Sequence, residues 1–367
     1  MKTTCNRAAL HEAVQLASSI VPSRTPKPVL QCAKLEADQN ENKLTVLATD
    51  NEIAIKYSVP QVQVERSGVA VAPADRLAGI LHETVDETVD IEVEDSTCQI
   101  CSKDSRFRVY GQDPEDFPPV ASLEQEASLE VKAGILRRLI QLTSFAAARE
   151  NTRYAINGVL WEQRGKKLRL VATDGRRLAR ADGEVTAAQK DAEQNAVVSI
   201  KAMMVLEKIL GDPDEVVRLS FTENQMFMQT ALVELTGNLV QGRFPKYDDV
   251  IPSGCDKKIQ ISNEGLRSAV RRAALLTNEQ SRGIQLLFGE DNVCFSSNTP
   301  EAGEAEINLK VDYQGESLKV GFNPQYLLEM LRVVDAAEVV FEFVDSSKPG
   351  LVKAGTDFLY VVMPISV

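Results

Sequence analysis

The sequence predicts an α+β fold made of three tandem copies of one unit, and three observations lead to this prediction. Similar strand and turn segments recur at one spacing, a glycine followed by Phe-Pro recurs with them, and amphipathic helices recur in step. Each unit is predicted to run helix, three strands, helix, three strands. Runs of short strands interrupted by single helices are typical of α+β layers and not of a parallel βαβ sheet.

The repeat is clearest in two segments that place Ala-Thr-Asp after an alternating apolar strand. Residues 44–50 read Leu-Thr-Val-Leu-Ala-Thr-Asp, and residues 168–174 read Leu-Arg-Leu-Val-Ala-Thr-Asp. At the same spacing, residues 293–298 read Val-Cys-Phe-Ser-Ser-Asn and continue the series weakly. A glycine followed by Phe-Pro occurs in 111–118 and again in 242–245. We therefore expect three units of similar length.

Hydrophobic periodicity places the elements of each unit in order. Apolar residues at i, i+3 and i+4 predict one helix that opens each unit and a second helix in its later half. These helices span 5–20 and 74–83, then 131–148 and 200–210, then 262–277 and 324–334. In the first unit, alternating strands span 29–37, 43–49 and 52–59 before the second helix, and 89–95, 98–102 and 105–110 after it. Linkers at 118–126 and 252–257 divide the chain into domains 1–122, 123–252 and 253–367.

Composition places the chain among ordinary globular proteins. Of its 367 residues, 44% are hydrophobic and 26% are charged, which supplies enough apolar surface for a folded core. Lys and Arg number 41 against 53 Asp and Glu, and the net charge of −12 argues against a uniformly basic surface that coats nucleic acid. No stretch approaches the roughly 18 apolar residues of a membrane span. No signal-peptide core follows Met1, so we expect a cytoplasmic protein without a membrane partner.

The cysteines give little support to a metal or redox site. Six cysteines are scattered along the chain and are expected to be reduced thiols. Cys98 and Cys101 form a Cys-x-x-Cys pair, but a zinc site needs two further ligands, and the nearest candidate, His82, stands alone. The simpler interpretation is that Cys98 and Cys101 are two residues of one strand. No metal or cofactor is predicted.

Each helix that opens a unit combines a core stripe with a basic outer face. The core stripes consist of Leu10, Val14 and Ala17 in the first unit, Ile135, Leu136, Leu139 and Leu142 in the second, and Leu266, Val270 and Ala273 in the third. The outer faces carry Arg7 and His11, then Arg137, Arg138 and Gln141 with Arg149 just beyond, then Arg267 and Arg271. One such face is usually just solvated, but recurrence in three units indicates a surface that attracts phosphates.

The basic faces predict DNA binding of a particular kind. Isolated arginines supply phosphate contacts without base readout, so duplex DNA would be bound without sequence specificity. An acidic protein would hold DNA poorly by affinity alone, because phosphate contacts weaken as salt rises. A closed ring would solve this problem, since it holds the duplex by topology and lets it slide.

Three other interpretations compete with a ring. Units of similar shape can form a plain tandem array, and a repeat scaffold could bind proteins without DNA. An enzyme is the third, but His11 and His82 are the only histidines and neither lies beside a candidate nucleophile. The sequence shows no P-loop and no dinucleotide-binding glycine fingerprint. Asp50 and Asp174 could be paired carboxylates, but capping of a tight turn is the plainer role.

Five segments in order along the chain carry a family resemblance: 153–158 (Arg-Tyr-Ala-Ile-Asn-Gly), 172–178 (Ala-Thr-Asp-Gly-Arg-Arg-Leu), 242–247 (Gly-Arg-Phe-Pro-Lys-Tyr), 321–323 (Gly-Phe-Asn) and 360–364 (Tyr-Val-Val-Met-Pro). Together they resemble the bacterial sliding clamp, the beta subunit of DNA polymerase III, over essentially the whole chain. The resemblance implies three DNA-clamp domains per subunit and a head-to-tail homodimer. Its helices would line a ring around double-stranded DNA, its sheets would form the outer wall, and it would be a processivity factor without catalytic activity.

The resemblance also implies three sets of site residues. A pocket for partner peptides maps to Arg153, Tyr154, Thr173, Gly175, Arg176, Leu178, Pro245, Val250, Asn323, Tyr326, Val361, Val362, Met363 and Pro364. DNA contacts map to Arg24, Arg137, Arg138, Arg149, Lys201, Arg267 and Arg271. The dimer interface maps to Phe107 and Val109 against Leu275 and Leu276. From the residues alone, packing of strand ends would explain any one pocket residue, and ordinary domain core would explain the four interface residues.

The implied partners are double-stranded DNA, the catalytic subunit of the replicative polymerase, and an ATP-driven clamp loader. Other proteins with the clamp-binding motif follow, among them repair polymerases, mismatch-repair proteins and ligase. Two places depart from the family pattern. Asp249 stands beside the pocket where members often carry a basic residue, and Ser366 and Val367 replace an Arg-Leu ending. Contacts with acidic partner residues at this rim therefore do not carry over from the resemblance.

Overall fold

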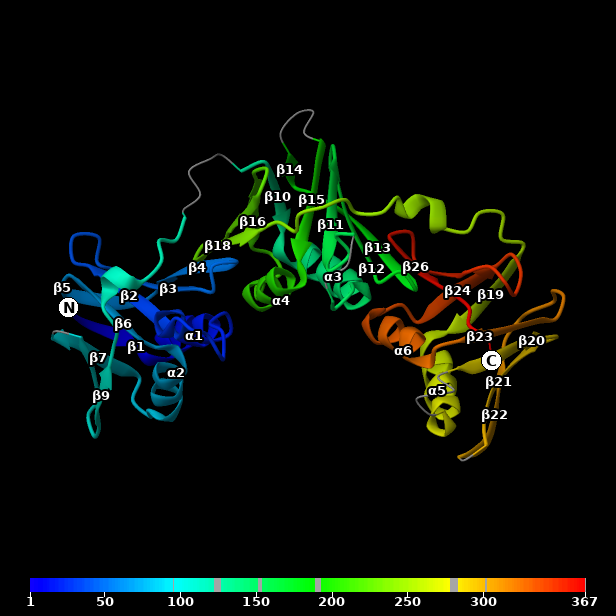
Figure 1. The fold of residues 1–367 in the computed structure, drawn as a ribbon, viewed down its shortest axis with the longest axis horizontal. Coiled ribbons are helices and arrows are strands. Elements are labelled where there is room, and N and C mark those ends of the chain that lie inside the picture. The colour runs from blue at the N-terminus through cyan, green and yellow to red at the C-terminus, as the bar shows by residue number, and fades with distance from the viewer. Residues whose placement is uncertain are drawn as a thin grey trace. The chain divides into compact units, whose positions relative to one another are not determined.

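A computed structural model describes residues 1–94, 96–121, 127–150, 154–188, 193–277, 283–300 and 302–366. Antiparallel strands dominate these residues, and six α-helices lie among them (Figure 1). The chain divides into two compact units. Unit 1 consists of Met1–Gly134, Val185–Lys190 and Lys201–Leu239, and unit 2 of Ile135–Glu184, Asp191–Ile200 and Val240–Val367.

The threefold order of elements is confirmed, with more strands than the sequence predicted. The first repeat contains β1 (Lys2–Asn6), α1 (Arg7–Ser18), β2 (Cys32–Asp38), β3 (Lys43–Thr49), β4 (Ile53–Val59), β5 (Val62–Arg66), β6 (Gly68–Pro73), α2 (Ala74–Glu83), β7 (Thr88–Glu94), β8 (Thr97–Cys101) and β9 (Arg106–Tyr110). The second contains β10 (Leu129–Lys132), α3 (Ala133–Thr143), β11 (Gly158–Arg164), β12 (Lys167–Thr173), β13 (Arg177–Glu184), β14 (Ala187–Ala188), β15 (Glu193–Ser199), α4 (Ile200–Ile209), β16 (Val216–Phe221), β17 (Gln225–Gln229) and β18 (Val233–Asn238). The third contains β19 (Lys257–Ser262), α5 (Asn263–Ala273), β20 (Ile284–Gly289), β21 (Asn292–Thr299), β22 (Gly303–Lys310), β23 (Leu318–Phe322), α6 (Pro324–Val333), β24 (Glu338–Phe343), β25 (Gly350–Ala354) and β26 (Phe358–Val362).

Strands from successive repeats join edge to edge in the larger sheet of each unit. Unit 1 has sheets ordered β5-β1-β7-β8-β9 and β14-β10-β16-β17-β18-β4-β3-β2-β6. Unit 2 has sheets ordered β15-β11-β12-β13-β26-β25-β24-β19 and β22-β21-β20-β23. The joins are antiparallel: Val233–Gly237 of β18 lies opposite Ile53–Tyr57 of β4, and Arg177–Ala181 of β13 lies opposite Phe358–Val362 of β26.

The helices that open the repeats are shorter than predicted, because a strand precedes each of them. Asn6 caps α1 by accepting the Ala9 N–H on its Oδ1 at 3.0 Å. Residues 2–6 therefore stay extended and pair with both β5 and β7. The last turns predicted for the opening helices of the second and third repeats are 3-10 turns, η3 (Ser144–Ala146) and η5 (Ala274–Leu276). The strand predicted from residue 29 begins at Cys32, because Pro28 starts the 3-10 turn η1 (Pro28–Gln31).

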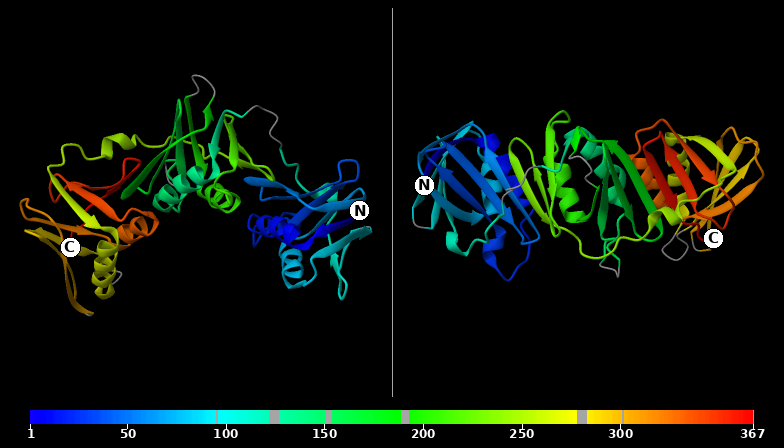
Figure 2. Two further views of the ribbon diagram at one scale, coloured as in Figure 1. Left: turned by 180° about the vertical axis from the view of Figure 1, so that it is seen from behind. Right: turned by 90° about the horizontal axis from the view of Figure 1, so that it is seen from above.

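The predicted core stripes are buried. Leu10, Val14, Ala17, Leu136, Leu139, Leu142, Leu266, Val270 and Ala273 all have at most 6% of their surface exposed, while Ile135 is only partly buried. In unit 2, α5 and α6 pack side by side (Figure 2). Phe288, Phe322, Phe341 and Phe343 contact one another in the core of the third repeat. The rings of Phe341 and Phe343 stack with centroids 4.6 Å apart.

The six cysteines are free thiols. Burial raises the pKa of Cys5 and of Cys32 to about 11 and that of Cys98 to about 12, so these three thiols stay protonated at neutral pH. In the described part of the chain, no group of three or more His, Cys, Asp or Glu residues is placed to hold a metal ion. No helix among the same residues is long and apolar enough to cross a membrane.

Candidate functional site

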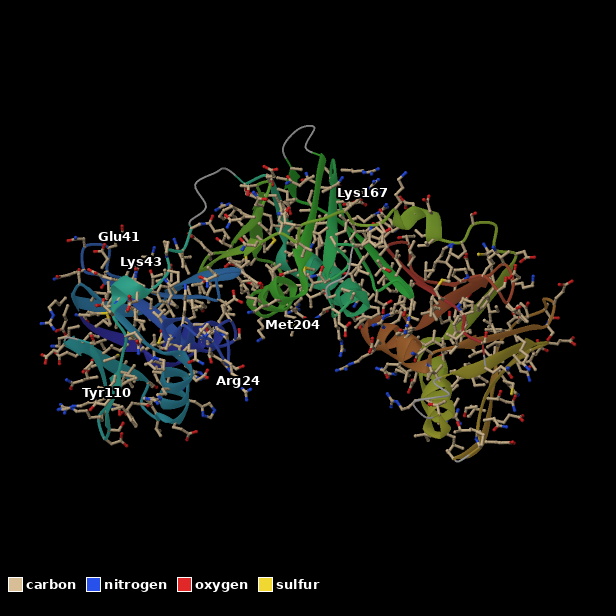
Figure 3. All side chains as sticks on the ribbon, viewed as in Figure 1. Arg24, Glu41, Lys43, Tyr110, Lys167 and Met204 are labelled. Carbon is tan, nitrogen blue, oxygen red and sulfur yellow. The ribbon has the colours of Figure 1, made fainter. Side chains whose placement is uncertain are left out.

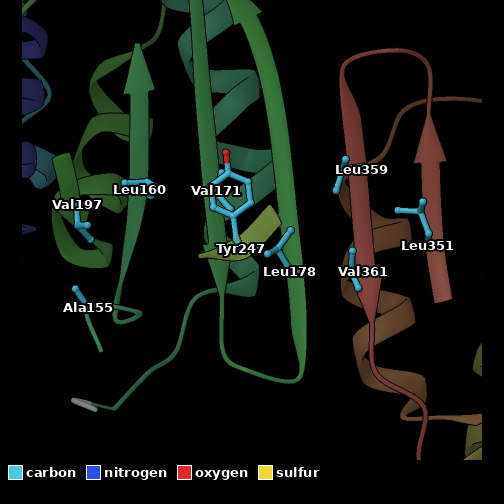
Figure 4. Close-up of a cluster of buried hydrophobic side chains, with 9 residues drawn as sticks. All are labelled: Ala155, Leu160, Val171, Leu178, Val197, Tyr247, Leu351, Leu359 and Val361. Carbon is cyan, nitrogen blue, oxygen red and sulfur yellow. The ribbon is translucent and has the colours of Figure 1, made fainter. Parts of the chain in front are cut away.

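The join of β13 and β26 in unit 2 brings together several of the residues expected in the partner pocket. Leu178 of β13 pairs with Val361 of β26, so both side chains point to the same face of the sheet. They belong to a buried apolar cluster, here called the junction cluster, which consists of Ala155, Leu160, Val171, Leu178, Val197, Tyr247, Leu351, Leu359 and Val361 (Figure 4). Val240, Phe244 and Ile251, from the segment that links β18 to β19, pack against it.

The turn between β12 and β13 is held in one shape by its own side chains. Thr173 Oγ1 donates to the Arg177 carbonyl at 2.6 Å and accepts the Gly175 N–H at 3.1 Å. Asp174 Oδ1 accepts the N–H groups of Arg176 and Arg177 at 2.9 and 3.0 Å. Gly175 has a φ of +84°, which glycine adopts without strain. The exposed Gly175 and Arg176 thus occupy fixed positions at the end of the join.

The corresponding turn of the first repeat has the same hydrogen bonds. Thr49 Oγ1 donates to the Ile53 carbonyl at 2.9 Å. Asp50 Oδ1 accepts the N–H groups of Glu52 and Ile53 at 2.9 and 2.8 Å. The interpretation of Asp50 and Asp174 as turn-capping residues is therefore confirmed.

Arg177 is a residue of this site that the sequence analysis missed. Its buried guanidinium lies 3.0 Å from Asp174 Oδ2 through Nε and 2.5 Å from Glu329 Oε2 through Nη1. Nη2 donates to the Phe145 carbonyl at 2.8 Å. Burial opposes the charge, but Tyr360, Glu329 and Asp174 together hold the Arg177 pKa above its usual value. Arg177 therefore ties α6, through Glu329, to the turn that carries Gly175 and Arg176.

The same guanidinium positions Tyr326, which was expected in the pocket. The Arg177 guanidinium carbon lies 4.6 Å from the centre of the Tyr326 ring, within the range of a cation–π contact. The hydroxyl of the buried Tyr360 donates to the Tyr326 carbonyl at 2.9 Å. Tyr326 is therefore fixed by residues from both β13 and β26.

The chain after β26 continues past the turn as an extended tail. The Met363 N–H donates to the Arg176 carbonyl at 2.9 Å, and the Ile365 N–H donates to the Gly321 carbonyl at 2.9 Å. Apolar side chains within a few residues of the junction cluster remain exposed: Tyr154, Val250, Met363 and Ile365. Exposed apolar side chains that gather at one place on a surface are typical of protein-binding sites.

Other residues expected in the pocket have different positions. Val362 is fully buried, and since successive strand residues alternate, it faces away from the junction cluster that contains Val361. Asn323 caps α6 by accepting the Gln325 N–H on Oδ1 at 2.9 Å. Pro245 and Pro364 are partly buried, and Arg153 lies outside the described residues.

The residues expected to contact DNA fall into two groups. Arg24, between α1 and η1, is exposed (Figure 3), as is Arg149. On α5, Arg271 is exposed and Arg267 partly buried, on the face opposite the buried core stripe of that helix. All four side chains reach the surface, three of them exposed and Arg267 partly buried.

The second group is engaged within the chain. Arg138 donates to the Val333 carbonyl at 2.6 Å and pairs with Asp335 at 2.9 Å. Lys201 pairs with Asp50, and Arg137 is partly buried. A phosphate contact by Arg138 or Lys201 would compete with the ion pair that each side chain already makes. The helical spacing of the sequence does not reveal these ion pairs.

The residues expected at the dimer interface also differ in exposure. Phe107 of β9 is exposed, and 76% of the Leu275 surface is accessible. Val109, at 4%, belongs to the core of the first repeat, and Leu276 is partly buried. Tyr110, which the sequence analysis missed, exposes 74% of its surface at the end of β9 (Figure 3).

The two histidines lie beside each other, 5.7 Å apart between ring centroids. His82 Nδ1 lies 2.9 Å from Glu83 Oε1. Burial, together with the neighbouring His82 and Arg7, lowers the pKa of His11. The lowered pKa favours the neutral form of His11, which reduces the positive charge that this residue adds to the outer face of α1.

Comparison with known proteins gives a consistent result along the whole chain. Family models of the N-terminal, central and C-terminal domains of the DNA polymerase III beta subunit match residues 1–121, 130–246 and 248–366. A beta sliding clamp of Pseudomonas putida is 34% identical over 368 residues, with 100% of both chains covered.

Two solved structures are similar to the fold. A sliding clamp from Pseudomonas aeruginosa bound to griselimycin has a TM-score of 0.93 and 34% identity, with 100% of both chains covered. A DNA polymerase sliding clamp from Bacillus subtilis has a TM-score of 0.94 and 28% identity, covering 100% of this chain and 99% of that one. Because three consecutive family models match nearly every residue, the chain belongs to the DNA polymerase III beta subunit family, the bacterial sliding clamps.

Proposed function

We propose that two copies of this chain join head to tail into a ring of six clamp domains, which encircles double-stranded DNA without sequence specificity and tethers the replicative polymerase. The family is that of the sliding clamp, a non-catalytic accessory subunit that makes DNA polymerase III processive. We infer domains at 1–122, 123–252 and 253–367, which the ends of the three family-model matches support. The ring would work in the cytoplasm, on the replicating chromosome.

One observation carries the proposal: the same kind of strand join occurs twice within the chain. In unit 1, β4 of the first repeat pairs with β18 of the second, and in unit 2, β13 of the second repeat pairs with β26 of the third. The strand equivalent to β4 and β13 in the third repeat is β22, and the strand equivalent to β18 and β26 in the first is β9. Each is an edge strand of its sheet in the described chain. Pairing of β22 with β9 of a second copy would make a third join of the same kind as β4–β18 and β13–β26. Such heterologous joins close a ring when the rotation from one subunit to the next completes a full circle.

The charges on the two free edges support their pairing. Arg106 and Arg108 are exposed on β9, and Glu304 and Glu306 are exposed on β22. None of these four side chains has an ion-pair partner among the described residues. Opposite charges facing each other across two antiparallel strands favour the pair, and like charges disfavour it. The exposed Phe107, Tyr110 and Leu275 supply apolar area beside these charges.

The junction cluster and its exposed neighbours support a partner site for short peptides. The proposed site combines three features: the apolar side chains of the junction cluster, the backbone of residues 363–365, and the fixed turn at Gly175 and Arg176. Such a surface suits an extended peptide with alternating apolar side chains. The flexible Met363 suits several ligands. We propose that the polymerase catalytic subunit, the clamp loader, repair polymerases, mismatch-repair proteins and ligase share this site, and that griselimycin binds there too.

The dimer can be tested by reversing the edge charges. We expect Arg106→Glu with Arg108→Glu to weaken the dimer roughly 30-fold, about 2 kcal/mol, because two favourable pairs become repulsive. Adding Glu304→Arg and Glu306→Arg to the same chain should restore the dimer mass on light scattering. Lys167→Glu, an exposed lysine of β12 (Figure 3), is the control. An unchanged mass for the double variant would show that these edges do not meet.

The partner site can be tested with two exposed methionines. Met363 lies beside the junction cluster, whereas Met204 is on α4 in unit 1 (Figure 3). We expect Met363→Ala to weaken binding of a synthetic peptide carrying the clamp-binding segment of the polymerase by about 5- to 10-fold, because roughly 1 kcal/mol of apolar burial is lost. Met204→Ala should change nothing, and removal of residues 363–367 should abolish binding while the dimer persists. Undiminished binding by calorimetry after that removal would place the peptide elsewhere.

The DNA face can be tested through salt dependence. We expect Arg267→Ala with Arg271→Ala to weaken DNA association and to reduce the slope of log affinity against log salt by about 1 to 2, since two phosphate contacts are lost. Arg164→Ala with Lys167→Ala, at the β11–β12 hairpin, is the matched control. A scaffold that binds only proteins would show no difference between the two pairs.

A further inference from the structure

We propose that Tyr247 is a positioning residue for the partner site: its hydroxyl, held between Glu162 and Arg169, fixes the segment that presents Pro245 and Val250 beside the junction cluster. The inference rests on the proposed function of that site. It assigns a role to a side chain that need not touch the bound peptide itself.

Tyr247 does not belong to a strand, but its side chain packs against the face of the larger sheet of unit 2. It is the first residue of the 3-10 turn η4 (Tyr247–Val250), 5% of its surface is exposed, and its ring lies in the junction cluster with Leu178 and Val361 (Figure 4). Its hydroxyl donates to Glu162 Oε2 at 2.5 Å and accepts from Arg169 Nη1 at 3.3 Å. The phenol therefore has both an acceptor and a donor on the sheet.

The groups that hold the hydroxyl form a ladder across three neighbouring strands. Glu162 of β11 pairs in register with Arg169 of β12, which pairs in register with Asp182 of β13. Arg169 binds Asp182 with two hydrogen bonds, Nε to Oδ1 at 2.6 Å and Nη2 to Oδ2 at 3.0 Å. Bidentate pairs of this kind fix the guanidinium plane. Tyr247 is thus docked onto a rigid row of alternating charges.

Tyr247 is the buried anchor of the short stretch from Pro245 to Val250, which the partly buried Phe244 and Ile251 flank. Between Pro245 and Val250, Tyr247 is the one buried side chain, while Lys246, Asp248, Asp249 and Val250 are exposed. Val250, at 49% exposure, lies between two attachments: Tyr247, three residues before it, and Ile251, directly after it, which packs against the junction cluster. Of the two, Tyr247 adds directional hydrogen bonds to the sheet, so its hydroxyl fixes the orientation of the turn that carries Val250.

The hydroxyl keeps its proton over the working range of pH. Burial, and then the hydrogen bond to Glu162, raise the pKa of Tyr247 to about 12, although Arg169 acts in the opposite direction. At neutral pH the phenol is therefore a donor to the Glu162 carboxylate, and its titration does not act as a pH switch.

Tyr247→Phe tests the inference, because it removes the hydroxyl and keeps the ring. We expect the dimer mass to be unchanged and the affinity for the polymerase peptide and for griselimycin to fall about 5- to 10-fold. Tyr313→Phe is the matched control: Tyr313 is also buried, and its hydroxyl donates to the Glu316 carbonyl at 2.7 Å, in the third repeat. That variant should bind both probes like the wild type.

Two further readouts separate positioning from general stability. Val250→Ala should weaken peptide binding in the wild type and have little further effect in Tyr247→Phe, whereas the two changes should add in the midpoint of thermal unfolding. Glu162→Gln keeps an oxygen acceptor and should lose less affinity than Glu162→Leu.

The possible results are distinct. If the wild type binds neither probe, the proposed partner site is wrong. If the wild type binds and Tyr247→Phe binds equally well, the role of Tyr247 is wrong. If Tyr247→Phe and Val250→Ala add in affinity as they do in stability, Tyr247 acts only on the fold and the inference is overturned.

Discussion

Backbone hydrogen bonding between the edge strands of successive repeats is the interaction on which the rest of the structure depends. An edge strand presents unpaired N–H and C=O groups, and proteins either cover such edges or pair them. Here one edge of the first repeat is paired by the second, and one edge of the second is paired by the third. β9 and β22 are left at the two ends of this series. In the proposed ring, a second copy of the chain supplies the missing partners of these two edges.

The proposed partner site depends on the second join. Because β13 and β26 pair side by side, residues from two repeats share one apolar cluster, and neither repeat could form it alone. Arg177 ties α6 to the turn before β13, and Tyr247 holds the connecting segment on the sheet. The chain has a net charge of −12, yet α5 carries the exposed Arg271 and the partly buried Arg267 on the face opposite its buried core stripe.

Much of the fold could be predicted from the sequence, because the helices carry strong periodicity. The helix predicted over 74–83 agrees with α2 at both ends, and the helix predicted over 324–334 ends one residue beyond α6. The strand β1 was missed because Lys-Thr-Thr-Cys-Asn carries little apolar pattern, and its identity depends on pairing with β5 and β7 far along the chain.

The site was predicted less completely, because burial of polar groups is a tertiary property. Arg176 and Arg177 are neighbours of one type, yet the first is exposed and the second buried. Only the fold brings Glu329 to Arg177 across a sequence separation of 152 residues. Val361 and Val362 likewise face opposite sides of one strand, which a resemblance of short segments does not distinguish. Arg138 and Lys201 were predicted to contact DNA, and the structure shows that each has an ion-pair partner within the chain.

The most direct test of the account is whether the protein is linked to DNA by topology. The labelled protein would be loaded onto a nicked circular plasmid by a clamp loader, freed of unbound protein by gel filtration, and then treated with a restriction enzyme that cuts the plasmid once. The account predicts retention on the intact circle at a salt concentration that abolishes simple phosphate binding, and release after the cut because the ring slides off the ends. Equal retention before and after linearisation would contradict encirclement.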